Sequence, residues 1–300
     1  MDILSLIEPT LMYSTPIIIA ALGGLFSERS GVVNIALEGI MLVGAFAAAT
    51  AQVTISSGNP WMSLVIGAFA GLLFSVLHAF ASINFKADQV ISGTALNIIS
   101  GGMTVYLTSL IFGETKSPTF GITFSKIDIP LIGKTYPTFI LALVLVIISY
   151  LVLKYTKFGL RLRSCGEYPQ ASESAGINVY LYRYFGVLIS GALAGVAGGI
   201  MVLTQDTRFS ITAIHGMGFI ALAALIFGKW DARGILFASL FFGFTTILNV
   251  YSKSIDALQG VSQEIFQMIP YVFTIIALVI TSGKSKGPKA SGEIYDKGKR

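Results

Sequence analysis

Long apolar runs with almost no charge decide what this chain can fold into. Such runs recur from residue 9 to residue 282, and the chain is 54% hydrophobic but only 12% charged. Soluble domains carry roughly 25% charged residues. Because about 20 apolar residues are needed to cross a bilayer as a helix, the pattern predicts an all-α, polytopic integral membrane protein, a helical bundle of about 8–10 transmembrane segments.

Nine stretches are apolar enough to be candidate spans. They are 9–26, 32–52, 61–83, 89–112, 137–156, 181–203, 214–229, 234–250 and 264–282. Polar residues interrupt the sequence near 24–40. The pair 214–229 and 234–250 is short and broken by glycine, which is compatible with re-entrant or half-helices. We therefore expect residues 1–282 to form a single transmembrane domain.

The distribution of Lys and Arg predicts the orientation, because cytoplasmic loops are enriched in these residues. With the loop 157–180 placed inside and the spans alternating, 15 of the 20 Lys and Arg residues fall on the inner side. This split predicts an external N-terminus, a cytoplasmic C-terminus and about nine crossings. The tail 283–300 is rich in Gly, Ser and Lys, so we expect it to be a disordered, basic, cytoplasmic segment.

The loop 157–180 is a long basic segment flanked on both sides by membrane-type sequence, KFGLRLRSCGEYPQASESAGINVY. Pro169 suits the first position of a helix and Gly176 suits its C-terminal cap. A short helix of about two turns is therefore predicted between them. On the residues alone, two interpretations remain open. The loop is either a rigid lever that docks into a soluble partner or a basic loop that serves only topology.

The charges of this loop suggest local pairing. Glu167 and Glu173 lie near Arg161 and Arg163 in the sequence, so the loop can pair charges locally.

Five polar residues within or beside the spans are candidates for a substrate pathway: Asn34, Glu38, Asn97, Gln205 and His215. A charge at the bilayer centre costs roughly 3 kcal/mol, so such groups must face protein or water. Each has a structural alternative. Glu38 can be a cap near the inner headgroups, Asn97 can supply an interhelical hydrogen bond, and His215 can be satisfied at the outer interface.

Aromatic residues offer a further hypothesis. Phe46, Phe209 and Phe219 could stack on a planar ligand. The chain has 21 phenylalanines, however, so most of them must face lipid or the core.

Two small-residue patterns bear on helix packing. Gly191, Gly195 and Gly199 form a ridge that predicts close helix packing. The segments Leu37–Ala48 and Ile214–Leu225 resemble each other and are predicted to run in opposite directions. Either they form an inverted-topology repeat with a site at its interface, or the likeness is a chance similarity of Gly/Ala-rich helices.

Several function classes lack their signatures. The chain contains no G-x-x-x-x-G-K-[ST] motif, no HExxH motif, no Cys/His cluster and no plausible catalytic triad. We expect no ATP site, no metal site and no catalytic residues in this chain. The single cysteine, Cys165, excludes an internal disulfide. The net charge of +5 is spread over loops and tail, which argues against nucleic-acid binding.

Three segments resemble a known family. Ser27–Phe46, Gly159–Val179 and His215–Gly234 are similar, in order and spacing, to the permease subunits of ABC importers. The resemblance covers most of residues 10–282 and points to the nucleoside and simple-sugar branch, which is related to ribose and branched-chain amino acid permeases. The run SERSGVVNIALEGIMLVGAF resembles the purine-nucleoside branch most.

The resemblance implies a function and a set of partners. The chain would form the solute pathway of an ATP-driven importer for nucleosides, with ribose or another simple sugar as the alternative. It would not be an enzyme and would bind no cofactor itself. Separate ATP-binding subunits would use ATP and Mg²⁺. A second permease chain, identical or different, and an extracytoplasmic solute-binding protein or lipoprotein would complete the complex in a bacterial or archaeal cell membrane.

The loop 157–180 would then couple the permease to the ATP-binding subunits. Candidate coupling residues are Gly159, Arg161, Arg163, Gly166, Glu167, Pro169, Glu173 and Gly176. Two other classes remain as rivals. An ion-coupled secondary transporter would need a carboxylate relay inside the membrane, for which only Glu38 is available. A non-transporting membrane scaffold would show no solute-dependent ATPase activity in its complex.

Overall fold

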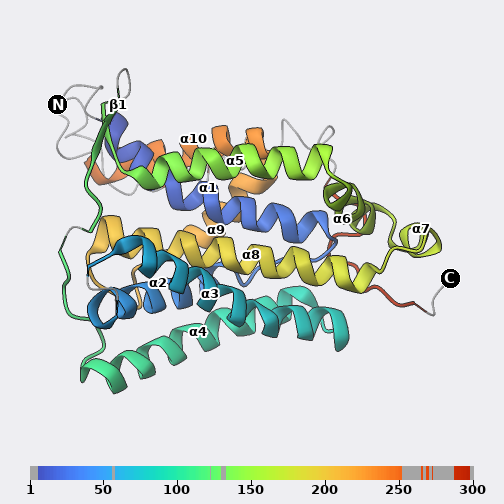
Figure 1. Ribbon diagram of the computed structural model, residues 1–300, viewed down its shortest axis with the longest axis horizontal. Coiled ribbons are helices and arrows are strands. Elements are labelled where there is room, and N and C mark those ends of the chain that lie inside the picture. The colour runs from blue at the N-terminus through green and yellow to red at the C-terminus, as the bar shows by residue number, and fades with distance from the viewer. Residues whose placement is uncertain are drawn as a thin grey trace.

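A computed structural model describes residues 6–55, 58–121, 123–129, 133–251, 265, 268–269, 272 and 287–297. Within these ranges most of the chain is helical, which confirms the all-α prediction. Figure 1 shows long helices lying side by side along one axis. The N-terminus and strand β1 lie at one end, whereas helices α6 and α7 and the C-terminus lie at the other (Figure 1).

Seven helices among the described residues are long and apolar enough to cross a membrane. They are α1 (Ile7–Arg29), α2 (Leu37–Thr54), α3 (Pro60–Ala79) with the π-helix η2 (Phe80–Asn84), α4 (Gln89–Phe112), α5 (Pro137–Tyr155), α8 (Val179–Met201) with the π-helix η3 (Val202–Asp206), and α10 (Ala232–Tyr251). Each corresponds to a predicted span. The predicted span 264–282 lies largely outside the described residues.

Helix α9 (Met217–Phe227) is apolar but too short to cross a bilayer. Its 11 residues extend about 16 Å at 1.5 Å per residue, about half the thickness of a bilayer's hydrocarbon. The prediction that 214–229 includes a half-helix is therefore confirmed. The other member of the pair, 234–250, is a full-length helix, because α10 continues without a break for 20 residues.

Local sequence signals fix several helix ends. The Asn59 side chain accepts a hydrogen bond from the Trp61 N–H, and Pro60 occupies the first turn of α3. The Asp88 side chain accepts from two backbone N–H groups at the start of α4. At the other end of α4, Gly113 has a φ of 74°, a conformation that costs glycine little.

Helix α8 lies at the centre of the bundle and packs against α1, α2 and α3. Its glycine ridge makes this packing possible. Gly191 faces the Gly71 carbonyl, and a side chain at Gly195 would overlap the Gly67 carbonyl of α3. Gly199 faces Leu64 of α3 and Ala48 of α2. The predicted packing role of the ridge is confirmed.

The predicted inner loop folds into two helices, α6 (Lys157–Glu167) and α7 (Pro169–Ser174). Pro169 begins α7, as predicted. Gly176 follows its end with a φ of 79°, and its N–H donates to the Glu173 carbonyl at 2.8 Å. At the opposite end of the bundle, β1 (Ile127–Ile129) and β2 (Gly133–Thr135) form a small antiparallel hairpin.

The described part of the tail, 287–297, differs from the predicted disorder. Ala290 and Tyr295 are buried, and the Ala290 N–H donates to the Gly166 carbonyl of α6 at 2.8 Å. Composition predicts disorder because the tail has too few apolar residues for a core of its own. It does not reveal that a terminus can be ordered by docking onto an existing surface.

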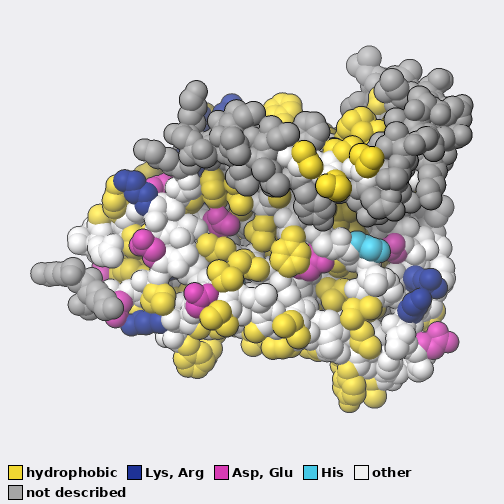
Figure 2. Space-filling view, turned by 180° about the vertical axis from the view of Figure 1, so that it is seen from behind, with side chains coloured by type: hydrophobic (Ala, Val, Ile, Leu, Met, Phe, Trp, Pro, Cys, Tyr) yellow, Lys and Arg dark blue, Asp and Glu magenta, His cyan; other side chains and the backbone are white. Residues whose placement is uncertain are grey.

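The surface places Lys and Arg side chains away from its apolar middle. In Figure 2, hydrophobic side chains occupy the middle of the face, and Lys and Arg lie toward its two ends. Large apolar side chains such as Val65, Ile98 and Phe237 are about 70% exposed or more. Exposed apolar side chains on long helices are what lipid-facing positions require.

Candidate functional site

Helices α2 and α9 begin next to each other inside the bundle. Glu38 lies in the first turn of α2, and its carboxylate accepts hydrogen bonds from the N–H groups of Gly216 at 2.8 Å and Gly218 at 2.7 Å. These donors belong to the first turn of α9, whose N–H groups have no partner within the helix. Glu38 therefore caps a different helix from its own, with its negative charge at the positive end of the α9 dipole.

The geometry of this meeting point bears on the predicted repeat. A side chain at Gly218 would lie 2.5 Å from the Glu38 backbone nitrogen, so the two helix starts are in direct contact. From there α2 extends toward the β1 end and α9 toward the α6 end (Figure 1). The opposite directions are those that an inverted-topology repeat requires. Shared ancestry of the two segments stays a prediction.

Asn34 and Asn97 fasten the irregular segment that precedes α2. Asn97 of α4 accepts from the Gly39 N–H at 2.8 Å and donates to the Ile35 carbonyl at 3.0 Å. Asn34 is fully buried and donates to the Ser190 hydroxyl of α8 at 2.9 Å. Hydrogen bonding between elements, the structural alternative for Asn97, is the arrangement observed. These bonds hold the start of α2 at a fixed depth in the bundle.

A cavity of about 600 Å³ opens beside the start of α9. Its described walls come from α1, α8 with η3, the segment before α9, α9 itself and α10. Polar lining residues include Tyr13, Gln205, Asp206, His215, Thr245 and Asn249. Small-molecule sites typically measure about 300–1,000 Å³ and combine apolar walls with a few polar groups. Figure 2 shows a histidine beside acidic side chains on a largely hydrophobic face.

The five predicted pathway residues divide into two groups. Gln205 and His215 line the cavity, whereas Asn34, Glu38 and Asn97 are not among its described lining residues. The latter three instead hold the two helix starts in place. Sequence reasoning could not separate these groups, because a buried amide and a ligand-facing amide look alike in a sequence.

The aromatic candidates also differ in position: one lines the cavity and two are buried. Phe219 lines the cavity and is 50% exposed. Phe46 and Phe209 are buried and pack edge-on to each other, with ring centres 5.5 Å apart. Only Phe219 of these three can therefore offer a ring to a ligand in the cavity.

The backbone at the edge of the cavity is irregular. The π-helix η3 ends at Asp206, and Thr207 and His215 both have positive φ, at 52° and 50°. Non-glycine residues rarely adopt this conformation, and such backbone often marks functional sites. Asp206, which with the predicted Gln205 closes the apolar run that ends at residue 203, also lines the cavity.

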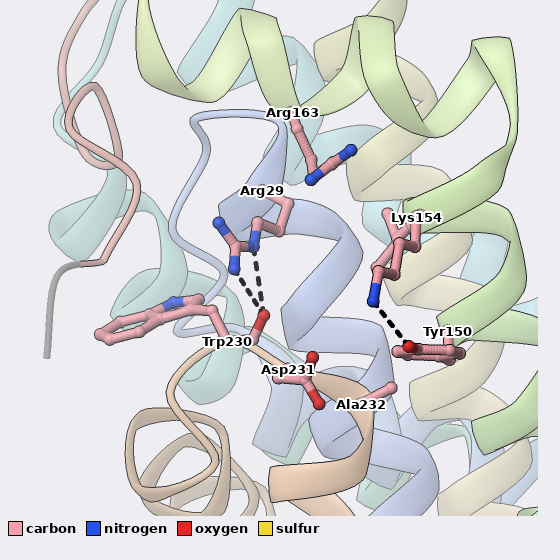
Figure 3. A pocket seen from close by; sticks show the side chains of 8 residues that line it. Arg29, Tyr150, Lys154, Arg163, Trp230, Asp231 and Ala232 are labelled. Carbon is pink, nitrogen blue, oxygen red and sulfur yellow. Dashed lines mark hydrogen bonds between the residues drawn. The ribbon is translucent and has the colours of Figure 1, made fainter.

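At the α6 end, Arg29 and Trp230 join three elements (Figure 3). The Arg29 guanidinium at the end of α1 donates to the Trp230 carbonyl at 2.7 and 3.2 Å. The Trp230 indole N–H donates to the Glu28 carboxylate at 2.6 Å. Arg29 also pairs with Glu167 of α6 at 3.7 Å. The C-terminal end of α9 is thereby tied to α1 and to α6.

The predicted pairing within the loop is wrong. Glu167 pairs with Arg29, and Glu173 pairs with Lys297 of the tail at 3.4 Å. Sequence spacing shows only local partners, whereas folding brings Arg29 and Lys297 from distant parts of the chain. Arg163 instead lines a basic pocket of about 180 Å³ with Arg29 and other residues labelled in Figure 3.

The remaining candidate coupling residues shape α6 and α7. Gly159 lies so close to the end of α5 that a side chain would approach the Leu153 Cα to 2.5 Å. Gly166 packs directly on the Arg29 backbone. Arg161 is exposed and donates to the Tyr182 hydroxyl of α8 at 3.3 Å. All eight predicted coupling residues therefore lie in α6, in α7 or at their boundaries, and their coupling role stays a prediction.

Comparison with known proteins places this arrangement in a family. The family model described as the permease component of the branched-chain amino acid transport system matches residues 6–278. The chain is 45% identical to the guanosine ABC transporter permease protein NupQ of Bacillus subtilis, over 100% of this chain and 99% of that protein. It is 44% identical to the nucleoside ABC transporter permease protein NupC of Lactococcus lactis, over 96% of each.

A third relative is more distant. The putative glucose ABC transporter permease protein TsgC13 of Haloferax volcanii is 31% identical, over 91% of this chain and 90% of that protein. The family match covers most of the chain, and it confirms the resemblance first identified from three sequence segments. This multi-pass membrane protein therefore belongs to the family of branched-chain amino acid transport system permease components.

Proposed function

We propose that this chain is a permease subunit of an ATP-driven ABC importer and that its solute is a nucleoside, with purine nucleosides favoured. The observation that carries the proposal is the full-length identity, near 45%, to permeases named for guanosine and nucleosides. The alternative, a simple sugar, has support from a relative at 31% identity.

The cavity beside α9 supplies the chemistry that a nucleoside needs. The half-exposed ring of Phe219 offers a face on which a planar base can stack. The Asp206 carboxylate accepts hydrogen bonds, and the Gln205 amide both donates and accepts. These groups suit base edges and ribose hydroxyls. A simple sugar would use the polar groups but has no planar ring to stack on Phe219.

Helix α9 provides a route from the α6–α7 end to the cavity. Its first turn, held by Glu38, contributes to the cavity wall. The turn after its last residue is held through Trp230 by Glu28 and Arg29, and Arg29 contacts Glu167 of α6. Displacement of α6 therefore reaches the cavity through a short, continuous set of contacts.

The partners proposed here are those that the family resemblance implies, and this arrangement is compatible with them. ATP-binding subunits, which bind ATP and Mg²⁺, dock at the α6–α7 end on the cytoplasmic side and move that end during alternating access. The same end carries Arg29, Lys154, Arg163 and Arg233, as cytoplasmic ends do. A second permease chain completes the pathway, and an extracytoplasmic binding protein delivers solute at the hairpin end. The C-terminus is cytoplasmic.

The test is transport by the reconstituted complex. The permease, its ATP-binding subunits and the binding protein are placed in proteoliposomes, and uptake of radiolabelled guanosine is measured. We expect uptake that requires ATP and is competed by nucleosides but not by ribose or glucose. Competition by sugars alone would support the sugar importer. Uptake driven by an ion gradient without ATP-binding subunits would support a secondary transporter.

A pair of variants tests whether the solute binds in the cavity. Phe219→Ala should raise the KM for guanosine about tenfold, because base–aromatic stacking contributes about 1–3 kcal/mol. Phe237→Ala, which removes a 71% exposed phenylalanine outside the described cavity lining, is the matched control. Equal KM values in the two variants would remove the cavity from the proposed pathway.

A further inference from the structure

The tail segment 287–297, called here the C-terminal strap, covers one face of α6 and α8. Its Ala290 N–H donates to the Gly166 carbonyl at 2.8 Å. The Tyr295 ring is 5% exposed, forms a small core with Cys165 and Val179, and packs edge-on against Tyr180 with ring centres 5.3 Å apart. The strap thus adds a buried layer where α6 meets the start of α8.

The strap also provides partners for a buried charge. Arg183 of α8 is 1% exposed, and its guanidinium donates to the Glu293 carbonyl at 2.9 Å. The same guanidinium lies 5.5 Å from the centre of the Tyr295 ring, within cation–π range. A buried charge is costly unless it is hydrogen-bonded. The strap is therefore bound to the central helix of the bundle.

Contacts from the strap hold both ends of α7. The Tyr295 hydroxyl donates to the Glu173 carboxylate in the last turn of α7, and Lys297 pairs with the same carboxylate at 3.4 Å. Lys289 donates to the Tyr168 hydroxyl, just before the first turn. A helix of six residues is not stable by itself. Its orientation therefore depends on contacts such as these.

A further ion pair links the strap to a fourth part of the chain. Asp296 pairs with Lys86, in the turn between η2 and α4, at 2.9 Å. The strap thus joins α7 to α6, to α8 and to the α3–α4 connection.

We propose that the C-terminal strap is a working part of the docking surface for the ATP-binding subunit: it fixes the orientation of α7 and carries the motion of α7 to α8 and to the α3–α4 connection. The inference rests on the proposed function, because it takes the α6–α7 end as the ATP-binding subunit's site. Tyr295 is a positioning residue in this scheme, acting through Glu173 and Arg183. It provides a route to the bundle that is separate from the contact between Glu167 and Arg29.

Cys165 gives a direct readout of the strap's position. It is the single cysteine of the chain and is buried under Tyr295. We expect Tyr295→Ala to expose the thiol and to raise its rate of maleimide labelling roughly tenfold or more at neutral pH, since a fall of one unit in the thiol pKa raises the thiolate fraction tenfold. Ile294→Ala, at the neighbouring exposed side chain, is the matched control and should label like the wild type.

The same variants then test coupling in the proteoliposomes described above. Tyr295→Ala should lower solute-stimulated ATPase activity and guanosine uptake at least about fivefold, while basal ATPase activity persists because it belongs to the ATP-binding subunits. Tyr295→Phe keeps the ring but loses the hydroxyl contact with Glu173. Its ATPase stimulation and uptake should fall between those of the wild type and Tyr295→Ala. A chain ending at residue 286 removes the strap entirely and should match or exceed the Tyr295→Ala defect.

The outcomes separate this inference from the proposed function. Normal stimulation and uptake in Tyr295→Ala despite rapid labelling of Cys165 would overturn the coupling role of the strap. Unchanged labelling of Cys165 in both Tyr295→Ala and the shortened chain would overturn its place on α6. Absence of stimulation in the wild type would instead reject the proposed function, and the labelling result would then decide the strap's structural role alone.

Discussion

Glu38 is a carboxylate inside a membrane bundle, and its surroundings explain why it is tolerated there. An ionised carboxylate away from water is costly unless it is paired or hydrogen-bonded. Here the two backbone N–H groups of Gly216 and Gly218 fill that role at the positive end of α9. The cost of burying the charge is thus offset by satisfying donors that α9 itself cannot satisfy. The same two hydrogen bonds thus stabilise the buried charge of Glu38 in α2 and satisfy the unpaired backbone donors at the start of α9.

Replacing Glu38 by glutamine should therefore weaken the start of α9. A neutral amide keeps one acceptor oxygen and loses the charge, so we expect a loss of about 1.5–3 kcal/mol of stability, typical of hydrogen bonds to charged groups. Thermal unfolding in detergent measures the effect. Glu8→Gln is the control, because Glu8 forms only a partly exposed pair with Lys126 at 2.5 Å and should cost less than about 1 kcal/mol. Equal decreases in the unfolding temperature of Glu38→Gln and Glu8→Gln would contradict the capping role.

Cys165 supports a prediction about pH. Burial raises the pKa of its thiol from 9.0 to about 11. A raised pKa keeps the thiol protonated, so at pH 8 its thiolate fraction should be about a hundredfold below that of a thiol with the ordinary pKa. Maleimide labelling of the purified permease should accelerate with pH up to about pH 11 rather than level off near pH 9. A plateau near pH 9 would show that the thiol is not buried.

At the scale of elements, the described part of the bundle combines full-length helices with the half-length helix α9, which is held at both ends. The spans could be predicted because apolar run length alone determines them, as in α4 and α5. The ends of α7 could be predicted from Pro169 and Gly176. The starts of α2 and α9 inside the bundle could not be predicted, because they are held by Asn97 and Glu38, which lie far from their partners in the sequence. The docking of the strap could not be predicted either, because its partners on α6, α7 and α8 also lie far away in the sequence.

Replacing glycine by alanine should have opposite effects on protein stability in α8 and in α4. Gly195→Ala in α8 places a methyl group into the Gly67 carbonyl of α3 and should destabilise the protein by about 1–3 kcal/mol. At Gly102 of α4, an added Cβ meets nothing within 4 Å. Gly102→Ala should therefore stabilise by up to about 1 kcal/mol through helix propensity. Thermal unfolding compares the two variants, and a loss of stability in both would mean that open space at Gly102 does not exist in the membrane.

At the scale of the whole molecule, the distribution of charge gives the bundle two distinct ends. The basic side chains of the pocket in Figure 3, the α6–α7 helices and the strap share one end, and the hairpin occupies the other (Figure 1). An excess of Lys and Arg predicts that the α6–α7 end is cytoplasmic. The burial of Cys165 means that the native thiol cannot report this orientation.

Introduced cysteines can report it. In a Cys165→Ala background, Lys116→Cys lies at the hairpin end and Ser174→Cys lies in α7, and both positions are exposed. A membrane-impermeant thiol reagent should label only Lys116→Cys in intact cells and both variants after lysis. Labelling of Ser174→Cys in intact cells would place α7 outside and would exclude ATP-binding subunits from that end.

The half-length of α9 has a consequence for engineering. One end of this rigid rod shapes the cavity wall, and the other end is anchored where Arg29 contacts α6. Under the proposed function, solute selectivity and the movement driven by the ATP-binding subunits would both depend on α9. Chimeras that import α9 from a permease of different preference will keep their turnover only if residues 28–38 are exchanged with it.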